Sequence, residues 1–203
     1  MHSDTSRGVD TTENNEIGER AIEQYKKVID VAPPKTDILN AVKGVAYMYL
    51  QMRKFDDAKE YYRRATALEP TDPEPYYSIG VIDWTEIYQL RQEERAKLGM
   101  RPADALPEED HALCATLREK NSGKIEDGID NFNKALELRP DYDDAMAYMN
   151  LMYRERTDVQ CDDPGAREAD LQSADDWVDK TMATKKAKAT KADRQPAFST
   201  TKQ

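Results

Sequence analysis

Three segments of the chain share one pattern of small, aromatic and proline positions. They are AIEQYKKVIDVAP (21–33), AKEYYRRATALEP (58–70) and GIDNFNKALELRP (128–140). Each has a small residue first, an aromatic residue four positions later, a small or β-branched residue three further on, and a proline five beyond that. Residues three and four apart share one face of a helix, and proline cannot continue a helix. The pattern therefore predicts three helices, each ended by its proline.

A second helical pattern follows each of these prolines. Asp72 can cap such a helix with Pro73 at its first position, and Asp141 follows Pro140 in a similar way. The repeating unit is therefore helix, tight turn, helix and proline stop. The positions at helical spacing are Val42, Val45, Ala46 and Tyr49, then Tyr76, Ile79, Gly80 and Asp83, then Met146, Met149, Asn150 and Tyr153.

This unit resembles the tetratricopeptide repeat, an antiparallel pair of helices. Ala46 and Gly80 match the small residue of the first helix, and residues 37–72 form the cleanest copy. The second helix of that copy matches at Ala58, Tyr62, Ala65 and Pro70. The resemblance covers residues 14–183 and implies an all-α fold, a right-handed superhelix of antiparallel helix pairs.

The resemblance also sets the expected boundaries along the chain. The first unit lacks its first helix, so the helix at 14–31 has no partner of its own. A disordered leader at 1–13 precedes it, and a basic disordered tail occupies 184–203. Between them we expect hairpins at 37–70, at 73–138 and at 142–183.

The hairpin at 73–138 is too long for one repeat. Ile87 and Leu90 continue its first helix, Gly99 is a plausible terminator, and helical periodicity restarts at His111. We therefore expect a protruding arm in which both helices are extended, with an ordinary inserted loop as the alternative. The long unit resembles uncharacterised bacterial tetratricopeptide proteins, which often carry an export signal.

Composition narrows the class of protein. The 203 residues are 38% hydrophobic and 34% charged, with a net charge of -10. An acidic body is a poor match for a phosphate backbone, so no nucleic-acid partner is expected. Six basic residues and one acidic residue lie in 184–203, and this tail leaves surface association as a weaker option. No apolar run is long enough for a membrane span and the start of the chain is polar, so we expect a cytoplasmic protein. The periplasm or cell envelope is the alternative, by resemblance to exported relatives.

The residues that usually carry chemistry are sparse. His2 and His111 form no metal pair, and Cys114 and Cys161 lie far apart in sequence, which indicates neither a disulfide framework nor a zinc site. We expect His111 and Cys114, on one helical face, to pack against the opposing arm. Clustered carboxylates fit helix starts better than catalysis. We therefore expect no enzyme activity, no cofactor and no metal.

A binding groove is the favoured site, because the first helix of each unit lines the concave face of such an array. Tyr and Trp there supply contact area at low entropic cost. Tyr47, Tyr77 and Trp84 could equally pack against neighbouring helices. The expected groove residues are Asn40, Lys43, Tyr47, Leu50 and Gln51, then Tyr77, Val81, Trp84 and Thr85, then Tyr148, Leu151 and Arg154.

Some members of the family grip a peptide's terminal carboxylate with Lys and Asn. Here Lys43 matches one such site, but Tyr47 stands at the asparagine position, so we do not expect that clamp. The sequence therefore favours a non-catalytic scaffold that binds a protein or peptide partner. The alternative is a self-assembling protein or fragment that forms a homo-oligomer through the unpartnered first helix and the arm.

Overall fold

The computed structural model describes residues 12–31, 34–101 and 110–193. Within these ranges the chain forms seven helices and no strand. Most of the expected leader, the tip of the long hairpin and the last ten residues lie outside the described residues. The helices are α1 (Thr12–Asp30), α2 (Lys35–Gln51), α3 (Phe55–Leu68), α4 (Pro73–Lys97), α5 (His111–Leu138), α6 (Asp143–Thr157) and α7 (Pro164–Asp193).

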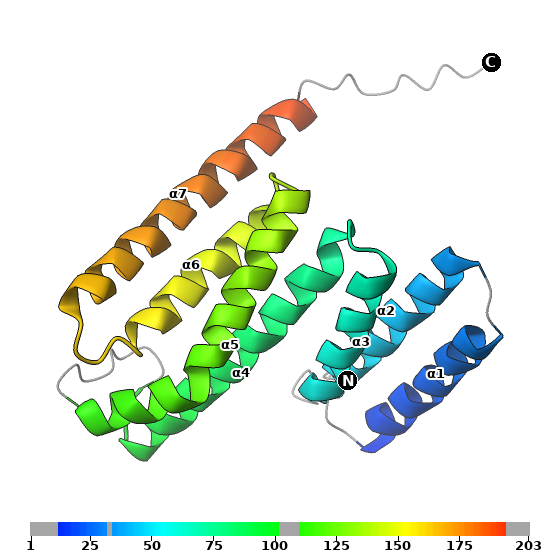
Figure 1. Cartoon of the computed structure of the whole chain (residues 1–203), viewed down its shortest axis with the longest axis horizontal. Coiled ribbons are helices and arrows are strands. Elements are labelled where there is room, and N and C mark those ends of the chain that lie inside the picture. Colours follow the sequence, from blue (N-terminus) through cyan, green and yellow to red (C-terminus); the bar gives the residue numbers. More distant parts are fainter. Residues whose placement is uncertain (1–11, 32–33, 102–109, 194–203) are drawn as a thin grey trace, which may run out of the picture.

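The helices form antiparallel pairs stacked in chain order (Figure 1). The pairs are α2 with α3, α4 with α5, and α6 with α7, while α1 packs against α2 at one end of the stack. One core lies between α4, α5 and α6, and a second lies between α2, α3 and α4. The all-α solenoid predicted from the repeat is therefore confirmed.

The helix boundaries follow from local capping chemistry. The Asp72 side chain accepts a hydrogen bond from the backbone N–H of Glu74 at 3.0 Å, and Pro73 opens α4 without an N–H to satisfy. Gly99, just after the end of α4, has φ +68°, a left-handed conformation that glycine adopts at little cost. Both start and stop are those predicted from the sequence.

Small residues allow an aromatic ring to enter the space between paired helices. At Gly80 on α4, a Cβ atom would lie 2.7–2.8 Å from three ring atoms of Phe132 on α5. Phe132 is fully buried. At Gly44 on α2, a Cβ would meet the ring of Tyr25 from α1 at 2.6–2.8 Å. These contacts fix how closely the helices approach, because a close-packed interior leaves the ring no alternative position.

The long hairpin does not protrude, contrary to the prediction. Arg91 of α4 pairs with Glu155 at 3.0 Å and with Asp158 at 3.3 Å, both at the end of α6. From α5, Arg118 Nε donates a hydrogen bond to the carbonyl oxygen of Val159 at 2.8 Å. The extension docks there because its arginines meet the carboxylates and open carbonyls that end α6.

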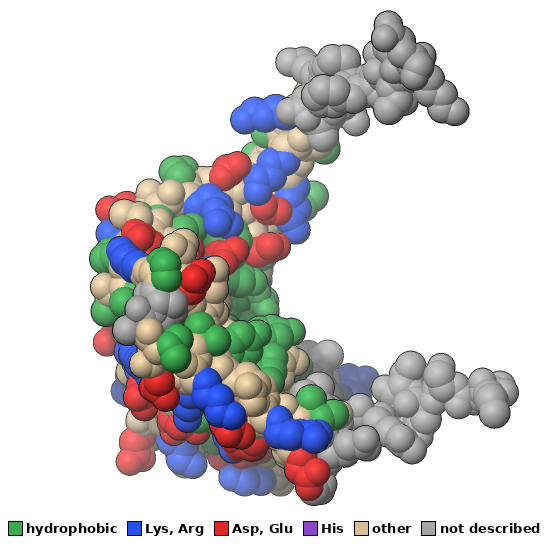
Figure 2. Space-filling model, turned by 90° about the vertical axis from the view of Figure 1, so that its right-hand side faces the viewer, with side chains coloured by type: hydrophobic (Ala, Val, Ile, Leu, Met, Phe, Trp, Pro, Cys, Tyr) green, Lys and Arg blue, Asp and Glu red, His purple; other side chains and the backbone are tan. Residues whose placement is uncertain are grey.

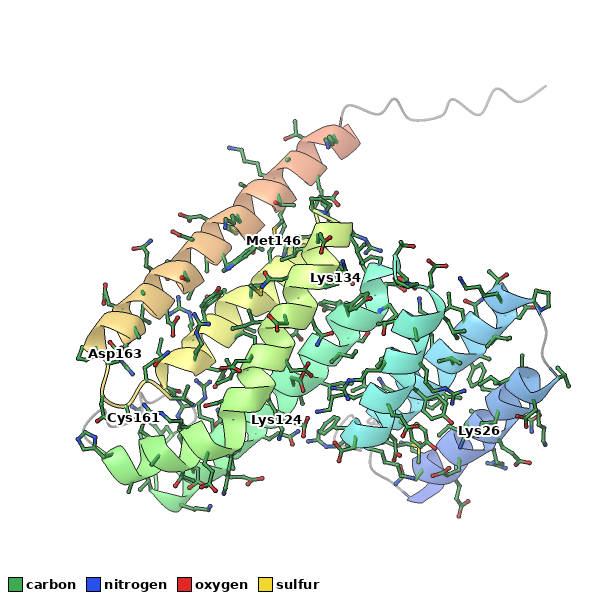
Figure 3. The ribbon with its side chains drawn as sticks, in the orientation of Figure 1. Lys26, Lys124, Lys134, Met146, Cys161 and Asp163 are labelled. Atoms are coloured by element: carbon green, nitrogen blue, oxygen red, sulfur yellow. A yellow bond between two sulfur atoms is a disulfide. The ribbon has the colours of Figure 1, made fainter. Side chains whose placement is uncertain are left out.

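A disulfide joins the same two parts of the molecule. Cys114 of α5 bonds to Cys161 in the turn between α6 and α7, so the expectation of no disulfide was wrong (Figure 3). The two cysteines are 47 residues apart in sequence, and only the docked hairpin brings their Cα atoms to 5.6 Å. His111 does not pack as expected: it is exposed, with Nδ1 3.3 Å from Asp162.

Helix α7 continues beyond the residue at which a disordered tail was expected to begin. It runs to Asp193, so the first ten residues of that segment are helical. Alanine and lysine, which dominate this stretch, have high helix propensity. The stretch also touches α6, since Lys188 pairs with Asp143, and the Thr184 hydroxyl lies 3.4 Å from the Met146 sulfur.

We predict that Gly80→Ala destabilises the protein although alanine is the better helix former. The added Cβ would collide with the fully buried Phe132 ring, at a cost of about 1–3 kcal/mol. The matched control is Gly123→Ala on α5, where a Cβ meets nothing within 4 Å. That control should gain up to about 1 kcal/mol in the free energy of unfolding. Urea titrations check both, and equal effects of the two substitutions would contradict the packing argument.

We also predict that the disulfide stabilises the fold. Closing a loop across 47 residues restricts the unfolded chain by about 4 kcal/mol in the loop-entropy model. Cys161→Ser should therefore lower the free energy of unfolding measured in urea, and dithiothreitol should lower it in the natural protein but not in the variant. A natural protein indifferent to dithiothreitol would refute the prediction.

Candidate binding groove

The molecule has a C-shaped profile with a hollow on one side. Figure 2 shows hydrophobic side chains gathered in that hollow. Aromatic rings of the first helix of each pair supply a continuous surface. Trp84 of α4 stacks on Tyr88 at a centroid distance of 5.1 Å and meets Tyr148 of α6 edge-on at 5.3 Å. These contacts join the third unit to the fourth.

The same aromatic row continues toward the start of α4. The Tyr77 ring lies 4.8 Å from Tyr142, 5.8 Å from Tyr148 and 6.0 Å from Phe132. Phe132 in turn stacks on Tyr148 at 5.6 Å. The row is therefore anchored on a core side chain, so its half-buried rings are held in place rather than free to rotate.

A pocket of about 430 Å³ lies at the end of this row. It is formed by four helices, and tyrosine is its commonest residue. Tyr47 on its edge is 50% exposed, whereas Tyr62 at its base is 5% exposed. The lining residues are Lys43, Gly44 and Tyr47 from α2, Tyr62 from α3, Glu74, Tyr77 and Ser78 from α4, and Tyr142 at the start of α6.

The one lysine of the pocket is already paired. Lys43 Nζ lies 2.9 Å from Asp72 and 2.7 Å from Glu74. Burial lowers the pKa of Lys43, but its hydrogen bonds to Glu74 and Asp72 outweigh burial and raise the pKa overall. The ammonium therefore stays charged and is shared between two carboxylates.

Burial is the main influence on the tyrosine hydroxyls, and nearby carboxylates add to it. Burial raises the pKa of Tyr77 and of Tyr148, and the nearby Asp144 raises both further. Burial also raises the pKa of Tyr142 against the opposing effect of Arg139, with Glu74 and Asp144 adding to the increase. The hydroxyls are thus neutral hydrogen-bonding groups in a region of negative potential.

The structure brings together only part of the expected groove. Lys43, Tyr47 and Tyr77 line the pocket, and Trp84 and Tyr148 belong to the aromatic row. The other expected residues lie outside the pocket lining. Leu50 packs on the core of the second unit and Val81 on the core of the third. Arg154 pairs with Asp175, Asn40 is exposed, and Gln51, Thr85 and Leu151 are half-buried.

Sequence reasoning missed five pocket residues, namely Gly44, Tyr62, Glu74, Ser78 and Tyr142. Tyr62 was matched only to the repeat pattern of the second helix, although its buried ring also lines the pocket. Glu74 is the second residue of α4 and Tyr142 is the N-cap residue of α6, so both lie before the helical pattern is established. Glu74 and Tyr142 share one signal in the sequence, because each lies two to four residues after a proline that ends the preceding helix.

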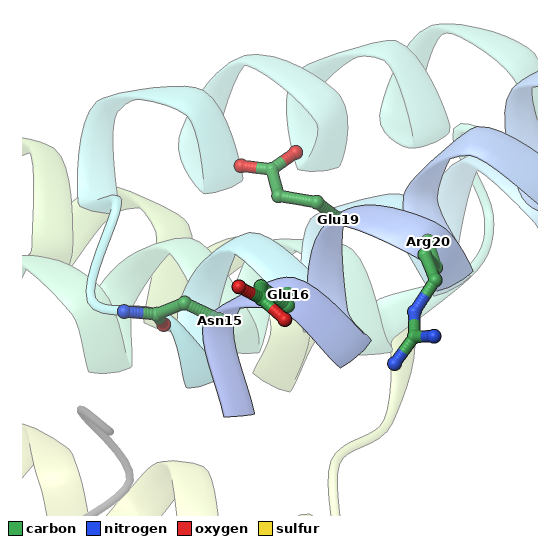
Figure 4. Close-up of a pocket in the computed structure, with 4 residues that line it drawn as sticks. All are labelled: Asn15, Glu16, Glu19 and Arg20. Carbon is green, nitrogen blue, oxygen red and sulfur yellow. The ribbon is translucent and has the colours of Figure 1, made fainter. Parts of the chain in front are cut away.

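A second cavity, of about 470 Å³, lies against α1 and is lined by Asn15, Glu16, Glu19 and Arg20 (Figure 4). In that view Glu19 and Arg20 point in different directions. Glu19 also pairs with Lys54. Among the described residues, the lining side chains come from two turns of α1, whereas the tyrosine pocket gathers side chains from several elements.

The titratable groups buried elsewhere join helices together. Lys59 of α3 pairs with Asp83 at 3.0 Å and with Glu86 at 2.7 Å, both on α4. Burial raises the pKa of Asp83 to about 7, against the lowering effect of Lys59. Within the described ranges, no three His, Cys, Asp or Glu side chains are grouped to hold a metal ion. The ion pairs of Lys59 cross-link two units and lie apart from the pocket.

Comparison with protein families identifies the unit. The family model described as tetratricopeptide repeat matches residues 44–72, which include the second half of α2, all of α3 and the cap of α4. These residues are a tetratricopeptide repeat. The matched repeat supplies Gly44, Tyr47 and Tyr62 to the pocket. The tetratricopeptide pattern predicted from the spacing of small, aromatic and proline residues is therefore confirmed for residues 44–72.

None of the curated proteins matches this chain in sequence. Two crystal structures of MamA are each 19% identical, cover 94% of this chain and 99% and 93% of their own, and have TM-scores of 0.31 and 0.32. A structure of MamA MSR-1 C2 is 17% identical, covers 86% of this chain and 94% of its own, and has a TM-score of 0.27.

Among the described helices, none combines the length and apolar character needed to cross a membrane.

Proposed function

We propose that this tetratricopeptide protein is a non-catalytic scaffold that binds a peptide or protein partner in its concave groove. The observation that carries the proposal is the tyrosine pocket, which gathers side chains from three consecutive units at the end of a fixed aromatic row. A surface prepared in this way binds at low entropic cost, because the rings are already ordered before the partner arrives.

The groove has the composition of a binding hot spot. Tyr47 is half exposed at the edge, and Tyr77 and Trp84 are half-buried rings that pack on neighbouring aromatic side chains. Tyrosine and tryptophan dominate binding energy in protein interfaces, since they bury a large area with few rotatable bonds. An extended segment that follows the row would pass from the second unit to the fourth.

We predict that Tyr47→Ala combined with Trp84→Phe weakens capture of a partner by about tenfold without unfolding the protein. Trp84→Phe keeps a ring against Tyr148, so the core contact survives. The measurement is a pull-down from host lysate, followed by an affinity measurement with the identified partner. Leu98→Ala is the control, because it removes an exposed apolar side chain at the opposite end of α4 from the pocket.

Capture of the same partners with unchanged affinity by the double variant would show that the groove assignment is wrong. A bait that recovers only itself would instead favour self-assembly as the second candidate function. One observation favours that candidate: Ile17, Val28 and Val31 of the first unit are 51%, 39% and 76% exposed, and their spacing places them on one helical face. With the long hairpin docked, this face is what remains for the self-assembly hypothesis.

We further propose that the protein works in an oxidising compartment, the periplasm or cell envelope of the alternative above. The Cys114–Cys161 disulfide supports this, because disulfides persist in oxidising compartments and are rare where glutathione and thioredoxin keep thiols reduced.

The expected result is that protein taken from its own cells carries no free thiol. Cells are lysed in denaturant with an alkylating agent, and the mass of the intact chain is measured. Both cysteines should escape alkylation unless the sample is first reduced, when both react. A chain alkylated at both positions without reduction would place the protein in a reducing compartment.

A further inference from the structure

We propose that the tyrosine pocket takes a lysine or arginine side chain, so that the partner is a basic segment. This inference rests on the proposed function of the groove and adds the chemical class of its ligand. It follows from the ring arrangement of the pocket, from the pairing of its lysine and from a carboxylate left unpaired beside it.

The tyrosine rings of the pocket are suited to a cation. Tyr47, Tyr62, Tyr77 and Tyr142 line the pocket, and Tyr77 and Tyr142 lie 4.8 Å apart. The face of an aromatic ring attracts a cation, and a pocket lined by four tyrosines offers such a group to a side chain that enters it. The protein already uses one of these rings in this way, since the Arg139 guanidinium lies 4.4 Å from the Tyr142 centroid.

The cationic side chains at the pocket already have partners, which disfavours an acidic ligand. A partner carboxylate needs an available cation, yet Lys43 is held by Asp72 and Glu74 together, and Arg139 lies against Tyr142. A carboxylate entering the pocket would displace one of these pairings or remain unpaired at the cost of its desolvation. Recognition of a peptide carboxylate through Lys43 is therefore disfavoured by the geometry itself.

Asp144 supplies the missing partner for a cation. It is exposed in the first turn of α6, two residues after Tyr142 of the pocket, and makes no ion pair among the described residues, although its charge also acts on Lys188, which pairs with the adjacent Asp143. It is close enough to the aromatic row to raise the pKa of Tyr77, Tyr142 and Tyr148. A cation seated among the rings would therefore find a carboxylate beside it, the combination that favours arginine and lysine.

The rest of the protein supports the same choice. The chain carries a net charge of -10, so its field attracts a basic segment and repels an acidic one at long range. Such attraction alone is not selective, because any acidic surface offers it. Specificity comes from the short-range geometry of the rings and Asp144, and the two contributions can be separated by experiment.

The test uses hexa-arginine and hexa-glutamate as probes of the full chain, with affinities measured by calorimetry at low and physiological salt. Hexa-arginine should bind and hexa-glutamate should not. Asp144→Asn and Tyr47→Ala should each weaken hexa-arginine binding by about fivefold. Asp130→Asn, which removes one exposed carboxylate from α5, is the control of equal charge and should leave the affinity unchanged. Circular dichroism melts confirm that each variant is folded.

Each contrary result has a defined meaning. Equal losses with Asp144→Asn and Asp130→Asn would show general charge attraction and overturn the inference. Binding of hexa-glutamate in the pocket would also overturn it. If a captured partner depends on Tyr47 but is indifferent to Asp144→Asn and to excess hexa-arginine, the cation is wrong and the scaffold stands. If capture is independent of both Tyr47 and Asp144, the proposed function of the groove fails together with this inference.

Discussion

The packing of Phe132 against Gly80 is the contact on which the arrangement of the third unit depends. The ring enters the space where any other residue would place a Cβ, so α4 and α5 approach more closely than a side chain at position 80 would permit. The same ring contacts Tyr77 and Tyr148 on the groove side of the helix pair. A single core side chain therefore sets both the spacing of the helices and the position of the groove aromatics.

A second constraint joins neighbouring units through charged groups. Lys59 reaches Asp83 and Glu86 from the preceding unit, and Arg91 reaches Glu155 and Asp158 in the next one. Apolar side chains would slide past one another more easily, whereas each of these pairs is satisfied in one register. Asp83 occupies the column that holds Tyr49 and Tyr153 in the other units, so an acid replaces a ring where a lysine arrives from the side. The charged pairs thus fix how one repeat follows another, which the repeat pattern alone does not specify.

The sequence was sufficient for the elements that depend on local rules. The helix pairs, the cap at Asp72 and the stop at Gly99 follow from residues within a few positions of each other. The docked hairpin and the disulfide could not be predicted, because they depend on where residues far apart in the chain meet. Of the groove, Lys43, Tyr47 and Tyr77 were predicted from helical spacing, and Tyr62 was not, because a periodic pattern assigns each position to one face. Helical periodicity cannot indicate that one ring both packs in the core and lines a pocket.

Because some rings belong to both the core and the groove, the groove has positions that are free to vary and positions that are not. Tyr77, Trp84 and Tyr148 are held by ring contacts that continue into the core, so changing them disturbs the packing of α4 against α6. Tyr47 and Asp144 are exposed and are held by no such contact, so they can change without cost to the fold. Under the proposed binding mode, the fixed rings would supply a surface that favours a flat or cationic side chain, and the exposed pair would decide which one. Selectivity would then lie at the edge of the groove, where substitution leaves the helix pairs intact.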